Sequence, residues 1–367
     1  MKKMLFAINV GWYFDLHWKV RIESRMTENY DVHLCMSKPS IHNEKMHEIT
    51  LKRSSINLLD NIKTFYQAYK AFLKIQPDII HSVTVKPNLI FGFIALLYRK
   101  PILITIPGLG AMFSEGDRRN KLVANLLIFL YRIVSLNKKS VFIFENKTDL
   151  GLFKNKQICS DLNGFTVPGS GVNIDEYKAE KLKASSSSEL KLLFAARLLK
   201  GKGLYELVDV VSSLRKRNVN VSLDVAGIID FDSKEAIPVE MLEQWANEGK
   251  INWLGQVNQG MVDVIVNNDV IVLPTRYGEG LPRILIEANA CQRPVIATDI
   301  GGCKDFVIDG ENGLIVKTSN PHELERAIIR LTDRAYCAQL GENGRKRVEE
   351  FYTDNHVISC YQSIYNN

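Results

Sequence analysis

Mostly apolar runs of three to five residues alternate with stretches of helical periodicity along nearly the whole chain. Runs this short suit strands that are buried on both faces, as the strands of parallel sheets are. Helices between such strands carry the chain back across the sheet, so the pattern predicts an α/β fold with parallel sheets. The expected strands span residues 4–8, 32–34, 79–81, 102–105, 141–144, 192–195, 221–225, 252–254, 270–273, 295–297 and 313–316, with helices near 58–75, 88–98 and 119–135.

The chain is long enough for two domains of this kind. Its 367 residues exceed one ordinary domain, and a hydrophobic content of 46% supplies material for two cores. The serine-rich stretch 183–189 is the only low-complexity segment and indicates a flexible connection. We therefore expect two doubly wound, Rossmann-like domains, residues 1–182 and 189–350. They should face a central cleft at their strand ends, where such folds bind ligands.

Charge is distributed unevenly between the two halves. Residues 1–182 contain 26 Lys and Arg against 16 Asp and Glu, whereas the remainder contains 21 against 25. A basic first half favours an anionic partner such as a membrane surface, a lipid diphosphate or a nucleic acid. The alternative is that these charges serve solubility only.

Cysteine spacing and hydropathy indicate which cellular compartment suits the chain. The six cysteines include no Cys-x-x-Cys pair, which argues against a disulfide framework and a zinc site and favours a reducing compartment. Lys2 and Lys3 precede an apolar run as in a signal peptide, but Asn9 and Gly11 interrupt that run, so a buried strand is expected instead. No run of 18 apolar residues is present to span a membrane.

Residues 122–136 form the longest apolar stretch of the chain. Arg118, Arg119 and Lys121 precede this stretch, and Lys138 and Lys139 follow it. An apolar helix with basic ends suits an interfacial position, in which one face dips into a leaflet while the cations meet lipid headgroups. A buried core helix explains the same pattern and remains the alternative.

Residues 278–287 resemble a helix start built around an anion. Gly280 allows the backbone to approach a ligand, and Pro282 suits the first helical position because it has no N–H to leave unpaired. The free N–H groups and the helix dipole then favour negative charge. Glu287 lies five residues beyond Pro282, roughly 7 Å further along the helix, which is about the offset from a phosphate to the ribose of a nucleotide. A solvated surface glutamate is the alternative.

A second candidate site follows the strand expected at 192–195. Arg197 has the fork geometry for a bidentate contact to a diphosphate, and Lys202 supplies a point charge for the partner oxygens. Two basic residues in a loop carry little weight alone, but together with residues 278–287 they would complete a diphosphate site.

These segments carry a resemblance to the retaining glycosyltransferases of family 4. Residues 279–287 match the Glu-x(7)-Glu signature, and residues 195–203 match the donor-phosphate motif Gly/Ala-Arg-x-x-x-x-Lys-Gly. Residues 268–275, 288–298, 301–302 and 309–314 follow in family order. The resemblance is strong over residues 190–350 and implies the GT-B fold, with the first domain binding the acceptor and the second binding the nucleotide-sugar donor. It also implies that a last helix, residues 354–366, returns to the first domain.

The resemblance assigns donor-side roles residue by residue. It implies that Arg197 and Lys202 hold the diphosphate, that Glu287 accepts hydrogen bonds from the ribose, and that Glu279 meets hydroxyls of the donor sugar. The backbone N–H groups of Gly280 and Leu281 would reach the sugar and the diphosphate, and Gly11 stands where many members have a Gly-Gly pair at the donor. Glu279, Arg197 and Lys202 would form the catalytic set, with no metal and no cofactor.

In the first half the resemblance is weaker. Where many members have a histidine after the strand at 102–105, this chain has residues 106–108, Ile-Pro-Gly. The variant pattern resembles the branch that builds capsule, O-antigen and related surface glycans on a polyprenyl diphosphate. The candidate acceptor-side residues are His17, His81, Lys86, Gly108 and Gly110.

The sequence thus predicts a retaining glycosyltransferase that transfers a sugar from a UDP-sugar to a lipid-linked saccharide. It would work as a peripheral protein at the cytoplasmic face of the membrane, with no nucleic-acid partner. The alternatives are a nucleotide-sugar 2-epimerase of the same fold and a catalytically silent nucleotide-binding subunit. Glycoside hydrolysis, in which carboxyl groups about 5–9.5 Å apart flank the bond, would not need Arg197 and Lys202. Asp230-Phe231-Asp232 imitates a metal-binding Asp-x-Asp, but a polar loop explains it better.

Overall fold

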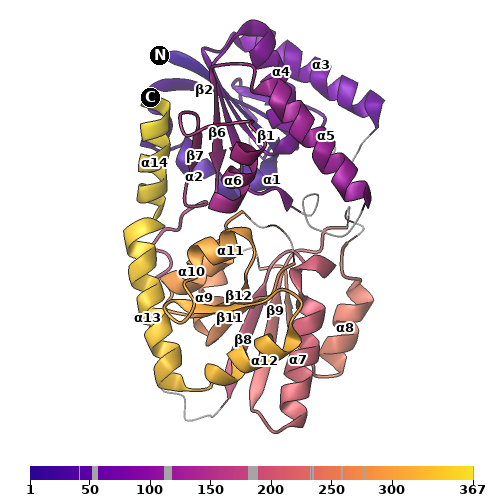
Figure 1. The fold of residues 1–367 in the computed structure, drawn as a ribbon, viewed down its shortest axis with the longest axis vertical. Coiled ribbons are helices and arrows are strands. Elements are labelled where there is room, and N and C mark those ends of the chain that lie inside the picture. Colours follow the sequence, from indigo (N-terminus) through magenta and orange to yellow (C-terminus); the bar gives the residue numbers. More distant parts are fainter. Residues whose placement is uncertain are drawn as a thin grey trace. The chain divides into compact units, whose positions relative to one another are not determined.

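The computed structural model consists of two compact α/β units. It describes residues 1–40, 42–51, 57–110, 118–180, 189–231, 233, 235–257, 259–276, 278 and 280–366. Unit 1 comprises Met1–Ser170 and Val357–Asn367, and unit 2 comprises Gly171–His356. Each unit contains one parallel sheet covered by helices on both faces (Figure 1). The expected fold class, two Rossmann-like domains with parallel sheets, is therefore confirmed.

Unit 1 contains a sheet of seven strands in the order β3-β2-β1-β4-β5-β6-β7. The strands at 46–48 and 164–166 were not predicted, because Met-His-Glu and Gly-Phe-Thr contain no apolar run. The elements are β1 (Lys2–Val10), α1 (Gly11–His17), α2 (Lys19–Ile22), β2 (Tyr30–Ser37), β3 (Met46–Glu48), α3 (Leu58–Ile75), β4 (Ile79–Val83), α4 (Val85–Tyr98), β5 (Ile102–Ile106), α5 (Arg118–Val134), β6 (Ser140–Phe144), α6 (Lys147–Asn155), β7 (Gly164–Thr166) and most of α14 (Asp354–Asn366).

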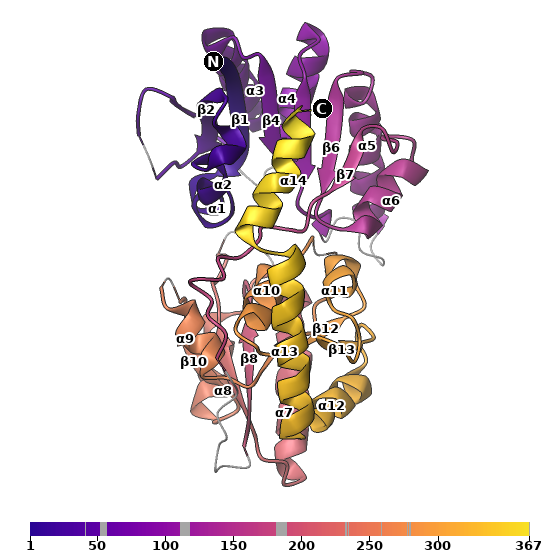
Figure 2. The ribbon, with the colours of Figure 1, turned by 90° about the vertical axis from the view of Figure 1, so that its left-hand side faces the viewer.

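Two hydrophobic clusters cover the two faces of this sheet. Alternate strand residues point to opposite faces, so Leu5 and Ala7 join one cluster while Phe6 and Ile8 join the other. The cluster around Leu5 includes side chains from α3, α4, α5 and α6. The cluster around Phe6 includes side chains from α1, α2 and α14 (Figure 2). The C-terminal helix is thus part of the core of unit 1.

Unit 2 contains a sheet of six parallel strands in the order β10-β9-β8-β11-β12-β13. The strands expected from the sequence in this half all form. The elements are β8 (Leu190–Ala195), the 3-10 turn η3 (Lys200–Lys202), α7 (Leu204–Lys216), β9 (Val221–Ala226), α8 (Val239–Asn247), β10 (Asn252–Gly255), α9 (Met261–Val266), β11 (Val270–Leu273), α10 (Arg283–Ala290), β12 (Val295–Thr298), α11 (Gly301–Phe306), β13 (Gly313–Val316), α12 (Pro321–Arg330) and α13 (Arg334–Phe351).

The boundary between the units lies earlier in the chain than the serine-rich stretch suggested. Residues 171–180 belong to unit 2, because Val172 exchanges backbone hydrogen bonds with Tyr352 and Asp354 and Tyr177 is buried in the core of unit 2. The junction was expected at residues 183–189, of which residues 183–188 lie outside the described residues. Local composition missed the boundary because it depends on these distant contacts.

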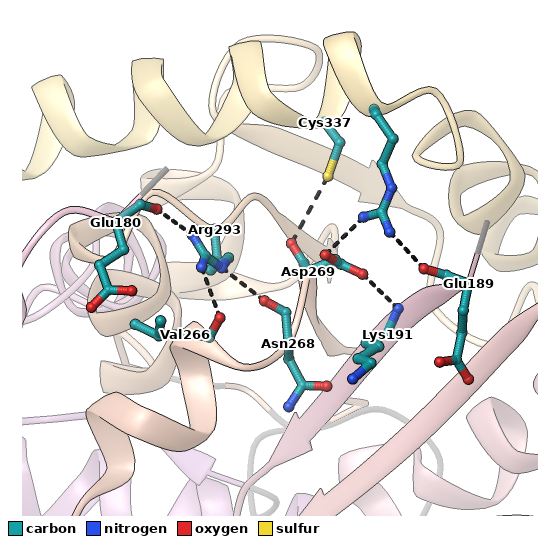
Figure 3. Close-up of polar contacts among 9 residues, drawn as sticks. Glu180, Glu189, Lys191, Val266, Asn268, Asp269, Arg293 and Cys337 are labelled. Carbon is teal, nitrogen blue, oxygen red and sulfur yellow. Dashed lines mark hydrogen bonds and ion pairs between the residues drawn. The ribbon is translucent and has the colours of Figure 1, made fainter. Parts of the chain in front are cut away.

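Polar contacts fasten the segments at the start of β8 and β11 (Figure 3). The Arg293 guanidinium donates hydrogen bonds to the carbonyl oxygens of Glu180, Val266 and Asn268 at 2.6–2.8 Å. The Asp269 carboxylate accepts from the backbone N–H of Lys191 at 2.8 Å and forms an ion pair with Arg334 at 2.7 Å. This network lies at the amino ends of the strands, whereas the candidate site lies at their carboxyl ends.

Among the described residues, no helix combines the length and the apolar character that crossing a bilayer requires. The described cysteines are all unpaired, and five of the six are buried.

Candidate functional site

The described residues of unit 2 that are predicted to bind the donor follow the two strands at the topological switch point of this unit. The chain leaves β8 toward β9 on one side, while β11 lies on the other side of β8, so the loops after β8 and β11 diverge at the carboxyl ends of adjacent strands. Ligands of doubly wound folds bind at this position. Arg197 and Lys202 follow β8, and Gly280 and Glu287 follow β11.

Direct contacts join these two loops although some 75 residues separate them. The Arg276 N–H donates to the Gly201 carbonyl at 2.7 Å, and Thr275 Oγ1 donates to the same carbonyl at 3.4 Å. Gly203 has φ of 84°, and a Cβ there would lie 2.1 Å from the Pro274 carbonyl oxygen. A glycine is needed at 203 for both reasons, since the backbone conformation is left-handed and the neighbouring loop approaches too closely for a side chain.

A third loop, after β12, closes against the same place. A Cβ at Gly302, near the start of α11, would lie only 1.4 Å from the Gly280 carbonyl oxygen and 2.9 Å from the Leu281 Cα. The side chain of Thr298 at the end of β12 donates to the Thr275 carbonyl at 2.6 Å. The absence of a side chain at Gly302 therefore allows the Gly280–Leu281 backbone to approach α11 closely, a function that the sequence did not reveal.

Arg197 and Lys202 differ in their surroundings. Arg197 is partly exposed and forms an ion pair with Asp230, with 3.4 Å between Nη1 and Oδ2. Lys202 is buried at the end of η3. Asp230 belongs to the Asp-Phe-Asp segment, whose second aspartate, Asp232, lies outside the described residues. The first aspartate thus pairs with the arginine of the expected diphosphate site.

Glu287 is held by two neighbours that the sequence analysis did not identify. It is 8% exposed, on α10, and its Oε1 accepts hydrogen bonds from Tyr177 Oη at 2.8 Å and from Arg283 Nε at 2.7 Å. Arg283 lies four residues before Glu287 in the same helix, a spacing from which the pair could have been predicted. Tyr177 gave no such signal, because it is 110 residues away.

The electrostatics of this triad keep the tyrosine protonated. Burial raises the pKa of Tyr177 well above its usual value, and the adjacent Glu287 carboxylate raises it further. The phenol therefore remains a hydrogen-bond donor at neutral pH. Glu287 Oε2 accepts no hydrogen bond from any described residue, so one oxygen is fixed while the other is available to a ligand hydroxyl.

The helix start differs by one position from the prediction. Pro282 is the N-cap of α10 with φ −65° and ψ 117°, and Arg283 is the first helical residue. The backbone thus enters the helix immediately after Gly280 and Leu281. Glu279, the other carboxylate of the signature, lies outside the described residues, and its expected role stays a prediction.

In unit 1, His81 is not an acceptor-side group. Its ring is fully buried, with Nδ1 at 2.5 Å from Tyr365 Oη and Nε2 at 2.8 Å from Thr105 Oγ1. Burial, with a contribution from the charge of Arg21, lowers the pKa of His81 to about 3. The prediction is wrong because His81 points into the core beneath α14, packed edge-on against Trp18.

The other acceptor-side candidates lie at or near the carboxyl ends of the strands of unit 1. Lys86, in the first turn of α4, is half-buried and donates to Asn61 Oδ1 at 3.2 Å, and burial lowers its pKa. His17 ends α1, with its ring 4.5 Å from that of Tyr13. Gly108 and Gly110 follow β5, and Gly110 has φ of 66°.

Gly11 begins α1 directly after β1, under the loop at residues 38–40. A Cβ there would lie 2.3 Å from the Lys38 carbonyl oxygen, so this glycine is required for close packing of the loop. Whether it also meets the donor stays a prediction. Two atoms at the same end of the sheet, Asn9 Oδ1 and Thr84 Oγ1, are buried without a hydrogen-bond partner among the described residues. Thr84 also has φ of 73°, which is rare for a β-branched residue.

Comparison with known protein families gives two matches that together span most of the chain. The family described as Glycosyl transferases group 1 matches residues 175–347, which is most of unit 2. The family described as Glycosyl transferase 4-like matches residues 3–146 in unit 1.

Three curated relatives cover most of the chain. The capsular polysaccharide biosynthesis glycosyltransferase CapM of Staphylococcus aureus is 28% identical, covering 94% of this chain and 92% of the relative. The N,N'-diacetylbacillosaminyl-diphospho-undecaprenol alpha-1,3-N-acetylgalactosaminyltransferase of Campylobacter jejuni is 25% identical, covering 95% and 94%. An uncharacterized glycosyltransferase of Methanocaldococcus jannaschii is 30% identical, covering 77% and 73%.

Among solved structures, Anabaena HepE in complex with UDP and glucose matches with a TM-score of 0.78. The two sequences are 16% identical, and the match covers all of both chains. At this identity the likeness supports the fold.

Proposed function

This chain belongs to the glycosyltransferases, and from that premise we propose that it transfers a sugar from a UDP-sugar, with retention, to a glycan on a polyprenyl diphosphate. The product would serve surface polysaccharide synthesis. CapM is by its name a capsular polysaccharide enzyme, and the name of the Campylobacter relative contains a diphospho-undecaprenol acceptor. UDP is present in the HepE complex, which has the same fold.

One observation carries the donor side of the proposal. Glu287, on α10, has one oxygen fixed by Tyr177 and Arg283 and the other unused by the described residues. The loop that precedes α10 contacts the loop that carries Arg197 and Lys202. A ribose diol donates two hydroxyl groups, which suits a carboxylate oxygen that accepts. A diphosphate suits Arg197, Lys202 and the N–H groups at the start of α10.

In the proposed reaction an acceptor hydroxyl oxygen forms a bond to the anomeric carbon of the donor sugar. The bond from that carbon to the β-phosphate oxygen breaks, and the departing phosphate oxygen takes the acceptor's proton. Arg197 and Lys202 stabilise the negative charge that develops on the diphosphate, which is electrostatic catalysis by groups already in position. This route uses no protein nucleophile, no metal and no cofactor.

The test is transfer of label from a panel of nucleotide sugars to a lipid-linked acceptor. We expect UDP-sugars to be used, and NMR of the product should show the donor's anomeric configuration. Glu287→Ala and Lys202→Ala should each lower transfer at least a hundredfold while circular dichroism stays unchanged. Glu243→Ala and Lys216→Ala, at exposed positions on α8 and α7, are the matched controls.

Three outcomes would contradict the proposal. Conversion of the donor sugar in the absence of acceptor would indicate an epimerase. Nucleotide binding without transfer from any donor would indicate a silent subunit. Inversion at the anomeric carbon would exclude the retaining route.

A further inference from the structure

Helices α3, α4 and α5 form one layer on unit 1. Their inner side chains belong to the hydrophobic cluster on one face of the sheet, whereas α14 covers the other face. Within the layer α4 packs against both α3 and α5 (Figures 1 and 2). The outer sides of these three helices therefore all point away from the sheet in the same direction.

The outer side of α5 is apolar. Leu122, Leu126 and Phe129 follow one another at helical spacing of four and three residues, and each is more than half exposed, with Leu122 at 72%. The inner side of the helix is equally apolar, with Ile128, Tyr131 and Val134 in the core. One side of this helix is thus buried, as expected for a core helix, and the opposite side is exposed and apolar, as an interfacial helix requires.

Helix α3 shows the same arrangement together with a row of cations. Leu59, Ile62 and Tyr66 lie on one exposed stripe, and Leu59 is 75% exposed. Lys63 and Lys70 are exposed on the adjoining stripe, and the same helical spacing extends that stripe to Lys74. The Lys70 ammonium lies 4.5 Å from the centre of the Tyr66 ring, so the cationic and apolar stripes are in contact.

The end of α4 adds further exposed apolar side chains to this layer. Leu97 is 71% exposed, and Tyr98 bridges to α3, with its hydroxyl 2.6 Å from that of Tyr69. We call the exposed apolar side chains of this layer the apolar face. It consists of Leu59, Ile62, Phe65, Tyr66, Leu73, Leu97, Tyr98, Leu122, Val123, Leu126 and Phe129.

We propose that the apolar face binds the surface of an anionic lipid bilayer, with α3 and α5 inserted at the boundary between headgroups and acyl chains. Large exposed apolar side chains gathered on one face are unfavourable in water, and a leaflet buries them. The lysine row of α3, with Lys121 and Arg132 on α5, places cations where anionic headgroups lie. If a second copy of the chain covered this face instead, two rows of lysines would lie close together and repel each other.

This inference rests on the proposed function in one respect, namely that a lipid-linked acceptor must be reached at a membrane. The surface is separate from the donor site of unit 2, because every residue of the apolar face belongs to unit 1. Vesicle binding and sugar transfer are therefore measurable independently of each other.

The experiment is flotation of the full chain with vesicles of phosphatidylcholine alone and with 30% phosphatidylglycerol. We expect binding to the anionic vesicles that weakens as salt is raised. Leu126→Ser with Phe129→Ser should lower it at least tenfold. Lys63→Gln, Lys70→Gln and Lys74→Gln should each lower it about fivefold, because one lysine near an anionic surface contributes about 1 kcal/mol.

Leu162→Ser and Phe231→Ser are the matched controls, since these side chains are 91% and 81% exposed but lie outside the apolar face. They should leave flotation unchanged. Transfer to an acceptor in detergent should be the same for all these variants if the face serves only membrane binding.

Normal transfer by a wild-type protein that ignores anionic vesicles would overturn the inference and leave the proposed function intact. Flotation of a wild-type protein that transfers no sugar from any donor would overturn the proposed function and leave the membrane inference intact. A concentration-dependent dimer in light scattering, dissociated by Leu126→Ser with Phe129→Ser and accompanied by no flotation, would show that the face binds a second copy instead.

Discussion

Tyr177 Oη donates a 2.8 Å hydrogen bond to Glu287 Oε1 across 110 residues of sequence. Tyr177 precedes β8 in the segment that enters unit 2, and its own carbonyl accepts from Arg345 Nη1 at 2.7 Å. That arginine also donates to the Ala290 carbonyl at the end of α10. The entry segment is thus fastened to the helix that carries the expected ribose contact, and Tyr177 orients Glu287.

Tyr177→Phe should weaken binding of UDP about tenfold. Loss of one buried hydrogen bond to a charged group costs about 1.5 kcal/mol and frees the Glu287 side chain to rotate. Calorimetry would measure the affinities of both proteins for UDP and for 2′-deoxy-UDP. The ratio between the two affinities should be smaller in the variant than in the wild type. Tyr336→Phe removes an exposed hydrogen bond, which Tyr336 Oη accepts from Arg330 Nη2 at 2.8 Å, and should change neither affinity. An unchanged preference in Tyr177→Phe would refute the orienting role.

Gly302→Ala should disrupt the donor loop. A Cβ at this position would lie 1.4 Å from the Gly280 carbonyl oxygen, and because both atoms belong to backbone segments neither can simply rotate away. We expect a lower melting temperature and loss of UDP binding. Gly151→Ala is the control, since a Cβ on that residue of α6 meets nothing within 4 Å. Alanine in a helix should be neutral or stabilising there. If both variants had the same melting temperature and the same affinity for UDP, the close contact at Gly302 would not be required for the donor loop.

His81 should make unit 1 less stable in mild acid. Its folded pKa of about 3 lies below the ordinary value of 6.5, so between these values the unfolded chain binds a proton that the folded chain excludes. The stability that comes from keeping His81 neutral is fully present above pH 6.5 and is lost as the pH falls toward 3. At pH 5 the loss in the free energy of unfolding is about 2 kcal/mol.

Urea unfolding at pH 7.5 and pH 5 would measure this dependence. The loss of stability between the two pH values should be smaller in His81→Gln than in the wild type, whereas His322→Gln, at an exposed position, should match the wild type. NMR titration of His81 in the native protein gives a second measure, and a normal pKa there would contradict the prediction.

Arg293→Met should destabilise unit 2 by more than about 3 kcal/mol, because it leaves buried carbonyl oxygens without donors. The guanidinium is almost fully buried, and its hydrogen bonds include the carbonyls of Glu180, Val266 and Asn268 (Figure 3). Thermal unfolding would record the change, with Arg326→Met at an exposed position on α12 as the control. A shift no larger than that of the control would show that other groups satisfy these carbonyls.

The order of strands and helices followed from the sequence because each element depends on its own residues. An apolar run such as 270–273 predicts a buried strand wherever it occurs, and the glycine and proline before Glu287 predict a helix start. The motif residues Arg197, Lys202 and Glu287 were selected in the same way, since each belongs to a short recognisable segment, and their donor-side roles stay predictions. The edge strands β3 and β7 were missed because Met-His-Glu and Gly-Phe-Thr contain no apolar run.

The decisions left to the tertiary structure all involve partners that are distant in sequence. His81 looked like a strand-end ligand until α14 placed Tyr365 against it. Residues 171–180 joined unit 2 through contacts with distant residues that include 287, 293, 345 and 352–354. The sequence showed that residues 122–136 are apolar, but only packing against α4 and the sheet decided which side of α5 is buried and which is exposed. The physical reason is that burial and hydrogen-bond partners depend on contacts across the fold, whereas periodicity and turn chemistry depend on neighbours along the chain.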